Sequence, residues 1–312
     1  MKGKDLLSIA DLSREDIRLL MSGAIDMKAE GWLSSLDRKI LALVFEKPSL
    51  RTRVSFEIAM RQLGGHVIYL SPDEVGLGKR ESVPDVARVL GRYADAIAAR
   101  TFSHQDLETL ASYSGVPVIN ALSDLEHPCQ ALADLLTICE KKEGLEGLTL
   151  AYVGDGNNVA HSLLLAASLT GINFRMASPS SNRVQEGILR LAQEYVVDSG
   201  AEIFCTEEPR LAVSGADVVY TDVWTSMGQE AEADRRHRIF AGYQVNNELL
   251  SLAREDAIFM HPLPTHRGEE VAEDILDSPR SVVFDQAENR MHLQKALLAG
   301  MLGGLEIPLA KY

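Results

Sequence analysis

The sequence predicts an α/β fold with two doubly wound parallel sheets, and three observations support this class. Short β-branched runs alternate with segments of helical periodicity along almost the whole chain. The length of 312 residues corresponds to two domains of roughly 150 residues each. Hydrophobic residues make up 46% and charged residues 24%, which leaves ample apolar material for two cores.

The first series of elements predicts a domain over residues 1–143. Its expected strands are short and rich in apolar and β-branched residues, and they cover residues 39–45, 67–70, 95–100 and 116–120. Its expected helices, in which apolar residues recur at helical spacing, cover residues 51–63, 105–112 and 128–141. Alternation of this kind indicates parallel strands joined by helical crossovers.

A charged, glycine-punctuated segment at residues 140–147 interrupts this pattern and marks a domain boundary. A second domain is expected over residues 148–287. Its predicted strands are 148–153, 172–177, 202–205, 217–221, 257–260 and 282–284, and its predicted helices are 158–169 and 183–199. The remaining C-terminal segment, 288–312, contains an amphipathic helix that we expect to complete the first domain.

Composition excludes several classes of partner. The formal net charge is −14, from 31 Lys and Arg against 45 Asp and Glu, so the global field repels nucleic acid and anionic membranes. No run approaches the ~18 consecutive apolar residues of a membrane span, and the N-terminus reads as untargeted. Three cysteines without a C-x-x-C pair favour a reducing, cytoplasmic location over a disulfide framework or a zinc ribbon.

An anion site is predicted where the first strand ends. The following helix opens near Ser49, which can cap it, and the first turn presents the positive end of the helix dipole. Arg51 adds a guanidinium that can fork onto two phosphate oxygens, and Thr52 adds a hydroxyl donor. A capped helix with solvated arginines is the alternative, but the position directly after a strand favours the anion site.

Two further groups are candidates for the same chemistry. Arg100 ends the predicted strand 95–100, and open α/β sheets bind ligands at this edge. His127 and Gln130 flank Pro128, the expected first residue of a helix, so the imidazole and the amide face one pocket a turn apart. A histidine alone is more often a structural hydrogen-bonding group.

The second domain offers a glycine turn and a carboxylate. Gly154 and Gly156 suggest a dinucleotide-binding turn and hence an NAD-dependent oxidoreductase, but Val159 occupies the third glycine position and no carboxylate ends the next strand. NAD binding is therefore rejected. Asp222 follows the predicted strand 217–221 and suits a cationic ammonium group, with a helix-capping aspartate as the alternative.

A family resemblance unites these blocks. Residues 45–57, FEKPSLRTRVSFE, resemble the carbamoyl-phosphate-binding motif of the aspartate and ornithine carbamoyltransferase family. Further matching blocks follow in the family's order at residues 99–101, 127–130, 154–158, 222–228, 261–264 and 288–290. Each block alone is weak, but together they are highly specific.

The resemblance implies a homotrimer, or a multiple of it, with active sites at subunit interfaces and with no metal or organic cofactor. It also implies which residues bind carbamoyl phosphate: Ser49, Leu50, Arg51, Thr52, Arg100, His127, Gln130 and Arg290. Of these, the family uses Arg100, His127 and Thr52 as catalytic groups that polarise the carbonyl.

The loop after Asp222 has the pattern D-x-x-x-S-M-G, which resembles the ornithine enzymes of the family. This implies transfer of the carbamoyl group to the δ-amine of L-ornithine, giving L-citrulline and phosphate in arginine metabolism. The residues implied to bind ornithine are Asn158, Asp222, Ser226, Met227, Pro262 and Leu263.

Two positions depart from the family pattern. Pro262 stands where the ornithine enzymes carry a cysteine, which leaves open another acceptor (N-acylated ornithine, putrescine or aspartate). Gly76 stands where relatives often carry a glutamine or histidine that reaches a neighbouring subunit, and Lys79 or Arg80 is either its substitute or a solvated cation. A relative that binds carbamoyl phosphate without turnover is the alternative outside enzymes.

Overall fold

The computed structural model describes residues 1–31, 35–225 and 230–303. The chain divides into two compact units: Met1–Leu136 together with the chain from Glu288 onward, and Thr137–Ala287. Each unit is built on one sheet whose strands are all parallel, with helices packed on it. The predicted α/β class with two parallel sheets is therefore confirmed.

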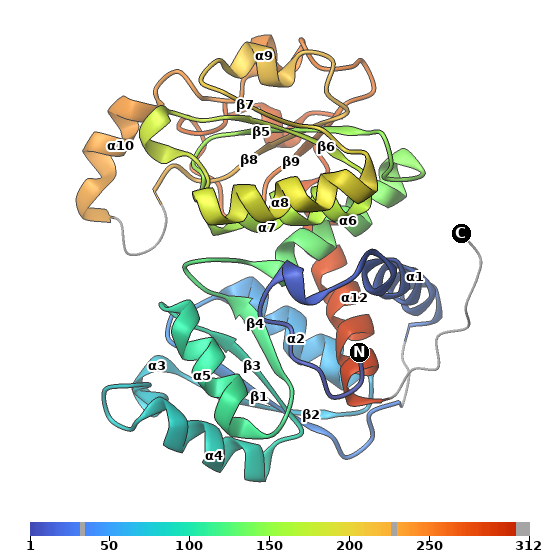
Figure 1. Ribbon diagram of the computed structural model, residues 1–312, viewed down its shortest axis with the longest axis vertical. Helices are drawn as coiled ribbons and strands as arrows, with labels where there is room; N and C mark the ends of the chain where they lie inside the picture. Colours follow the sequence, from blue (N-terminus) through green and yellow to red (C-terminus); the bar gives the residue numbers. More distant parts are fainter. Residues whose placement is uncertain (32–34, 226–229, 304–312) are drawn as a thin grey trace. The chain divides into compact units, whose positions relative to one another are not determined.

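The first unit contains a four-stranded sheet in the order β2-β1-β3-β4 (Figure 1). Its strands are β1 (Ile40–Phe45), β2 (His66–Leu70), β3 (Ala96–Arg100) and β4 (Val118–Leu122). Its principal helices are α1 (Arg14–Glu30), α2 (Leu50–Gln62), α3 (Pro72–Val75), α4 (Val83–Tyr93) and α5 (His104–Ser114). Helices α6 (Pro128–Lys142) and α12 (Val283–Leu302) are each divided between the two units.

Alternation along β1 explains how this sheet is covered on both faces. Ala42 and Val44 belong to a buried cluster with apolar residues of α4 and α5. Because successive side chains of a strand point to opposite faces, Leu41 and Leu43 face the other side, where α2 lies (Figure 1). All of β1 except Ile40 is buried, which accounts for its continuous apolar sequence.

Helix α4 is an element that the sequence analysis did not include. Ser82 caps it by accepting a hydrogen bond from the Asp85 amide at 3.3 Å, and Pro84 lies in its first turn. Val83, Val86 and Ala87 form its buried face. The capping serine, the early proline and the apolar spacing were the signals that could have identified it.

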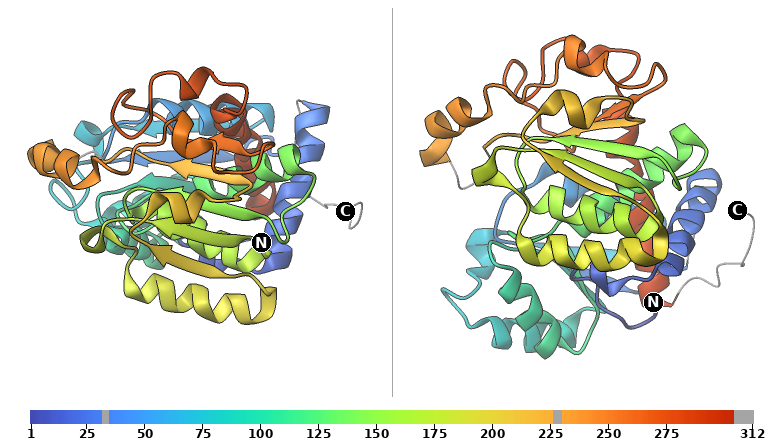
Figure 2. Two further views of the ribbon diagram at one scale, coloured as in Figure 1. Left: turned by 90° about the horizontal axis from the view of Figure 1, so that it is seen from above. Right: turned by 45° about the horizontal axis from the view of Figure 1, so that its top comes forward.

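The second unit contains a five-stranded sheet in the order β7-β6-β5-β8-β9. Its strands are β5 (Thr149–Val153), β6 (Asn173–Ala177), β7 (Ile203–Thr206), β8 (Val218–Thr221) and β9 (Ile258–Met260). Helices α7 (Asn158–Thr170) and α8 (Glu186–Ser199) cover one face, and α9 (Pro209–Val213) lies on the other (Figures 1 and 2). Two short helices, α10 (Ala233–Phe240) and α11 (Asn247–Leu250), follow β8.

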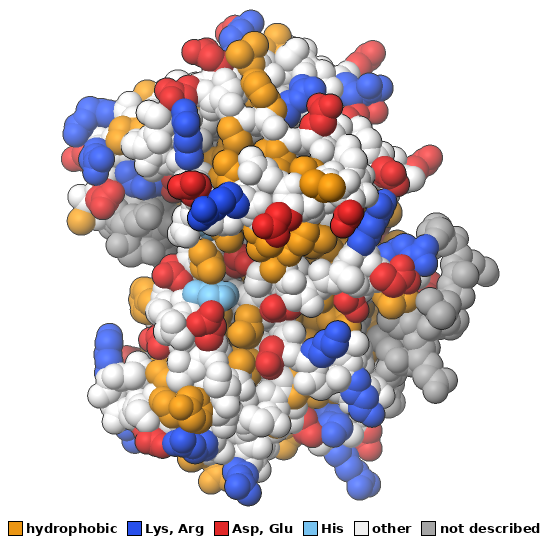
Figure 3. All heavy atoms as spheres, viewed as in Figure 1, with side chains coloured by type: hydrophobic (Ala, Val, Ile, Leu, Met, Phe, Trp, Pro, Cys, Tyr) orange, Lys and Arg blue, Asp and Glu red, His pale blue; other side chains and the backbone are white. Residues whose placement is uncertain are grey.

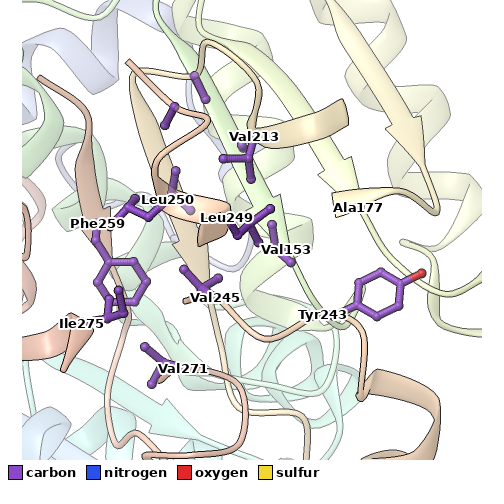
Figure 4. Close-up of a cluster of buried hydrophobic side chains, with 14 of the residues drawn as sticks. Val153, Ala177, Val213, Tyr243, Val245, Leu249, Leu250, Phe259, Val271 and Ile275 are labelled. Atoms are coloured by element: carbon purple, nitrogen blue, oxygen red, sulfur yellow. The ribbon is translucent and has the colours of Figure 1, made fainter. Parts of the chain in front are cut away.

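The second face of this sheet carries a buried apolar cluster (Figure 4). Val153 of β5 and Phe259 of β9 meet Val213 of α9 and Leu249 of α11 there. The cluster extends to Val271, which lies in the loop after β9. Side chains from widely separated segments thus fix the strand ends and the loops that follow them.

The predicted strand at 282–284 is wrong, because this segment begins α12. The Val282 amide donates to the carbonyl of Phe259 in β9, and this is the last backbone hydrogen bond between the segment and that strand. The Gln286 amide then donates to the Val282 carbonyl in the helical i→i−4 pattern. A pair of β-branched residues favours a strand locally, but it is too short to resist the helix that follows.

Three surface and composition features complete the description. None of the helices in the described ranges combines the length and apolar character needed to cross a bilayer. Acidic and basic side chains are interspersed over the face seen in Figure 3. Cys129, Cys139 and Cys205 are free thiols.

Candidate active site

The N-terminus of α2 follows the carboxyl end of β1, as the sequence predicts. Ser49 has an extended backbone, and its hydroxyl accepts a hydrogen bond from the Thr52 amide at 3.3 Å. The predicted N-cap is therefore confirmed. Leu50 is the first residue of α2 and is 77% exposed. A ligand at the N-terminus of α2 would therefore contact the backbone amide of Leu50.

Arg100 is the last residue of β3 and pairs in register with Phe45 of β1, so it lies at the same sheet edge as the start of α2. It is buried, and its Nε has no hydrogen-bond partner among the residues that the structure describes. Burial, followed by the nearby positive charges of Arg290 and Arg51, lowers the pKa of Arg100 to about 10. A buried guanidinium in this state is poised to take an anionic or strongly polar acceptor.

His127 lies immediately before α6 and is also buried. Burial lowers the pKa of its imidazole well below the usual range, and the charges of Arg290, Arg100 and Arg51 lower it further. The ring is therefore neutral near pH 7. A neutral imidazole can donate one N–H to a carbonyl oxygen without adding a fourth positive charge to the cluster.

Arg290 of α12 joins these elements. Its Nη2 donates to Thr52 Oγ1 at 2.8 Å, and its Nη1 donates to Gln130 Oε1. Gln130 in turn donates from Nε2 to Asp134 Oδ1 at 2.8 Å. All four side chains are buried, so α12, α2 and α6 hold one another through a fixed polar network.

The arrangement has a clear chemical preference. Arg51 and Arg290 act electrostatically on Arg100, all three act on the neutral His127, and the guanidinium groups of Arg100 and Arg290 are buried. Positive charges that lie close together and have little contact with water repel one another, and a bound anion relieves this repulsion. The cluster also offers donors for a polarised carbonyl oxygen, which is the setting for acyl-type transfer.

In the second unit the strands β5, β8 and β9 are neighbours, so the residues after their carboxyl ends share one sheet edge. Asp222 follows β8 and is buried. Its Oδ2 accepts from Asn157 Nδ2 at 2.7 Å, and its Oδ1 accepts from the Val223 amide at 2.8 Å. Burial raises the pKa of Asp222, although His261 and the Asn157 hydrogen bond oppose that rise.

His261 follows β9 and is completely buried beside Glu270. Its Nδ1 accepts a hydrogen bond from the Leu263 amide at 2.9 Å. Because Nδ1 is an acceptor, the ring N–H is at Nε2, which lies 3.2 Å from Glu270 Oε1. Because the Nδ1 lone pair is already used, this imidazole orients the loop and is not a free proton acceptor.

The other predicted ligands of the second substrate are distributed as follows. Asn158 is the first residue of α7, directly after Asn157, which caps that helix and contacts Asp222. Pro262 is buried and Leu263 is half-buried in the loop after β9, and Leu263 has a left-handed backbone with φ 58°. Ser226 and Met227 lie outside the described residues.

Sequence reasoning missed a buried ion pair behind the Asp222 loop. Arg236 of α10 donates from Nη2 to Asp155 and from Nε to the Trp224 carbonyl, so it links the turn after β5 to the loop after β8. Asp155 also accepts from Asn182 Nδ2 at 3.0 Å. The run from Asp234 to Arg238 has the composition of a solvated helix face, and nothing in it singles out Arg236 as the buried member.

Gly156 provides a test of the turn between β5 and α7. A Cβ there would lie 2.3 Å from the Arg183 carbonyl carbon, so Gly156→Ala must displace backbone. We expect it to lower the free energy of unfolding by about 1–3 kcal/mol. Gly187 in α8 has open space around it, and Gly187→Ala should instead stabilise by about 0.5–1 kcal/mol. Urea unfolding of both variants checks this, and equal effects would contradict it.

The departure at Gly76 has a local physical cause. Gly76 ends α3 in the left-handed conformation with φ 52°, where a side chain would be strained and would approach Arg80 Cβ to 2.8 Å. Arg80 donates from Nη1 to the Glu74 carbonyl at 3.2 Å and is exposed, and Lys79 is exposed beside it. Whether either cation reaches a neighbouring subunit stays a prediction.

Comparisons with known proteins agree with this geometry. Residues 4–140 match the aspartate/ornithine carbamoyltransferase carbamoyl-P binding domain, and residues 146–301 match the Asp/Orn binding domain of the same family. An ornithine carbamoyltransferase of Anoxybacillus flavithermus is 52% identical over 97% of this chain and 98% of its own length. An anabolic ornithine carbamoyltransferase of Pyrococcus furiosus is 50% identical over 98% of both chains.

Solved structures give the same result. The ornithine carbamoyltransferase from Pyrococcus furiosus superposes with a TM-score of 0.94 at 50% identity, covering 98% of this chain and 99% of that one. The enzyme from Thermus thermophilus superposes with a TM-score of 0.88 at 47% identity, covering 97% of this chain and 100% of that one. Both domains match in family order and the motifs lie at the expected strand ends, so the chain belongs to the aspartate/ornithine carbamoyltransferase family.

Proposed function

We propose that this chain transfers the carbamoyl group of carbamoyl phosphate to the δ-amine of L-ornithine, giving L-citrulline and phosphate. The observation that carries the proposal is the cluster of Arg51, Arg100 and Arg290 around the neutral His127. The identity of about 50% to ornithine carbamoyltransferases over nearly the full chain supports ornithine as acceptor. The anabolic name of the Pyrococcus furiosus relative supports the biosynthetic direction.

Carbamoyl phosphate would bind to the first unit. Its phosphate is assigned to the α2 terminus through Ser49, Leu50, Arg51 and Thr52, and to Arg290, which is already fixed on Thr52. Its carbonyl oxygen is assigned to the catalytic groups Arg100, His127 and Thr52. Gln130 Oε1 would accept from the carbamoyl amide, in a position held by Arg290 and Asp134.

Ornithine would bind to the second unit. The α-ammonium is assigned to Asp222, whose two hydrogen bonds from Asn157 and Val223 fix the carboxylate. The α-carboxylate is assigned to Asn158 at the N-terminus of α7. The assignment further includes Ser226, Met227, Pro262 and Leu263.

The chemical step needs no group beyond these. The neutral δ-amine attacks the carbamoyl carbon, the N–C bond forms, and charge grows on the carbonyl oxygen facing Arg100 and His127. The C–O bond to phosphate then breaks, and the amine proton leaves with the phosphate. Because Pro262 has neither a donor nor a thiol and the His261 Nδ1 lone pair is occupied, we assign no general base to that loop.

The direct test is citrulline formation from carbamoyl phosphate and L-ornithine, run beside L-aspartate, N-acetylornithine and putrescine. Turnover with ornithine alone is expected, since a buried single carboxylate suits an α-ammonium. Turnover with another amine would move the specificity to that acceptor and would give Pro262 a role in selecting it. Binding of carbamoyl phosphate without any turnover would refute the enzyme assignment.

The raised pKa of Asp222 predicts a pH dependence for ornithine. A carboxyl whose pKa lies above the usual value of about 4 becomes neutral at a correspondingly higher pH, and it then loses its attraction for the ammonium. We therefore expect KM for ornithine to rise as the pH falls toward that raised pKa. Steady-state kinetics from about pH 8 to about pH 5 measure this, and Asp222→Asn should lack the acid-side rise.

Three further assignments accompany the function. We assign carbamoyl phosphate binding to residues 1–143 with 288–312, and ornithine binding to residues 148–287. A homotrimer, or a multiple of it, is supported by exposed apolar side chains on α2 and β2, namely Leu50, Val54 and Ile68. Mass photometry tests this assembly.

A cytoplasmic location is supported by the free thiols.

A further inference from the structure

We propose that the loop after β9 contains a binding site for a divalent transition-metal ion of the zinc type, formed by His266, Glu269 and Glu270. One ligand atom from each of the three side chains lies within 4.8 Å of the other two. Ligand atoms around one tetrahedral zinc ion are about 3.3 Å apart, given bond lengths of about 2.0–2.2 Å. Small rotations of the exposed His266 and the half-buried Glu269 close that difference.

Glu270 provides the independent observation that points to a ligand. The residue is completely buried, and within the described ranges its Oε2 has no hydrogen-bond partner. Its other oxygen, Oε1, accepts from the His266 amide at 2.7 Å. A buried carboxylate with one oxygen that lacks a donor is costly, and a cation bound by this carboxylate together with His266 and Glu269 would offset that cost.

Glu269 is already held in the position that such a site requires. Its Oε2 lies 2.9 Å from His237 Nε2 and 3.6 Å from His266 Nδ1. His237 of α10 thus positions Glu269 from behind, as hydrogen-bonding partners of metal ligands commonly do. A metal ion between His266 Nδ1 and Glu269 Oε2 would leave the contact of Glu269 with His237 in place.

The ligand types select the class of ion. One imidazole and two carboxylates match the His and Glu ligands of zinc sites that keep a fourth position for water. Mg²⁺ and Ca²⁺ prefer oxygen ligands throughout and would gain little from His266. A cavity of about 480 Å³, lined by Glu269 together with His237 and Gly268, gives an ion access to Glu269 from solvent.

The experiment is calorimetric titration of tag-free full-length protein with Zn²⁺, with Mg²⁺ as the second probe. We expect one Zn²⁺ per chain and a rise in the unfolding temperature with Zn²⁺ concentration, since the ion binds the folded loop. His266→Ala and Glu269→Gln should each weaken Zn²⁺ binding by at least about 10- to 100-fold. Visible absorption of bound Co²⁺ should be lost in the same variants.

His66→Ala is the matched control, because His66 is an exposed histidine on β2 outside the cluster. It should bind Zn²⁺ like the original chain, and so exclude general binding to surface histidines. Thermal unfolding without metal shows that the variants are folded, which the exposure of His266 makes the expected result. Unsaturable Zn²⁺ binding, equal binding of Mg²⁺, or undiminished Zn²⁺ binding by folded His266→Ala would each overturn the proposal.

Discussion

Replacing Arg100 with alanine is expected to lower kcat for citrulline formation by about 10²–10³-fold. The guanidinium is buried at the carboxyl end of β3, and its Nε has no protein partner in the described part of the chain. It is thus preorganised for the oxygen on which charge grows in the transition state. Steady-state kinetics with both substrates measure the loss, and an unchanged kcat would refute the catalytic assignment.

The same substitution should not destabilise the protein without substrate. Burial and the neighbouring Arg290 and Arg51 lower the pKa of Arg100 to about 10, so its charged form is disfavoured in the folded state. Its removal relieves that repulsion. We expect Arg100→Ala to keep a free energy of unfolding at or above the original value in urea. Arg88→Ala, which removes an exposed guanidinium paired with Asp85, is the matched control and should leave kcat unchanged.

Replacing Asp222 with asparagine is expected to reduce kcat/KM for ornithine by two to three orders of magnitude. The carboxylate is buried, and loss of one partner of a buried ion pair costs about 3–5 kcal/mol. Asparagine has nearly the same shape but only one acceptor oxygen, so the Asn157 and Val223 donors cannot both be satisfied. Kinetics with varied ornithine at saturating carbamoyl phosphate give the effect.

Two controls separate substrate recognition from folding in this variant. Binding of carbamoyl phosphate to Asp222→Asn should be unchanged, because the residues assigned to it belong to the other unit. Asp198→Asn makes the same chemical change at an exposed position of α8 and should leave kcat/KM as it is. A parallel loss of carbamoyl phosphate binding in Asp222→Asn would indicate disrupted folding and contradict the assignment.

Strands that are buried along most of their length followed from local sequence. The strand β1, for instance, is a continuous apolar run that ends before Glu46, and its bounds lie within one residue of the expectation. Prediction failed at residues 282–284, where local β-propensity opposed a long helix. Propensities differ by at most about 1 kcal/mol, so the hydrogen bonds and packing of α12 decide the outcome.

The sequence by itself determined which residues stand at the carboxyl ends of strands. Arg100 ends a short apolar run, Asp222 and His261 each follow one, and the parallel strands of each sheet must present their carboxyl ends at one edge of that sheet. The motif order added the family resemblance and hence carbamoyl transfer. These inferences need only the periodicity of the chain and the chemistry of single side chains.

Only the tertiary structure decided which polar groups meet. Arg290 bonds to Thr52, 238 residues away, and Arg236 bonds to Asp155, 81 residues away. It also brought the buried carboxylate of Glu270 together with the side chains of His266 and Glu269. Local sequence carries no record of such distances, because burial and charge pairing arise only when the helices pack and water is removed.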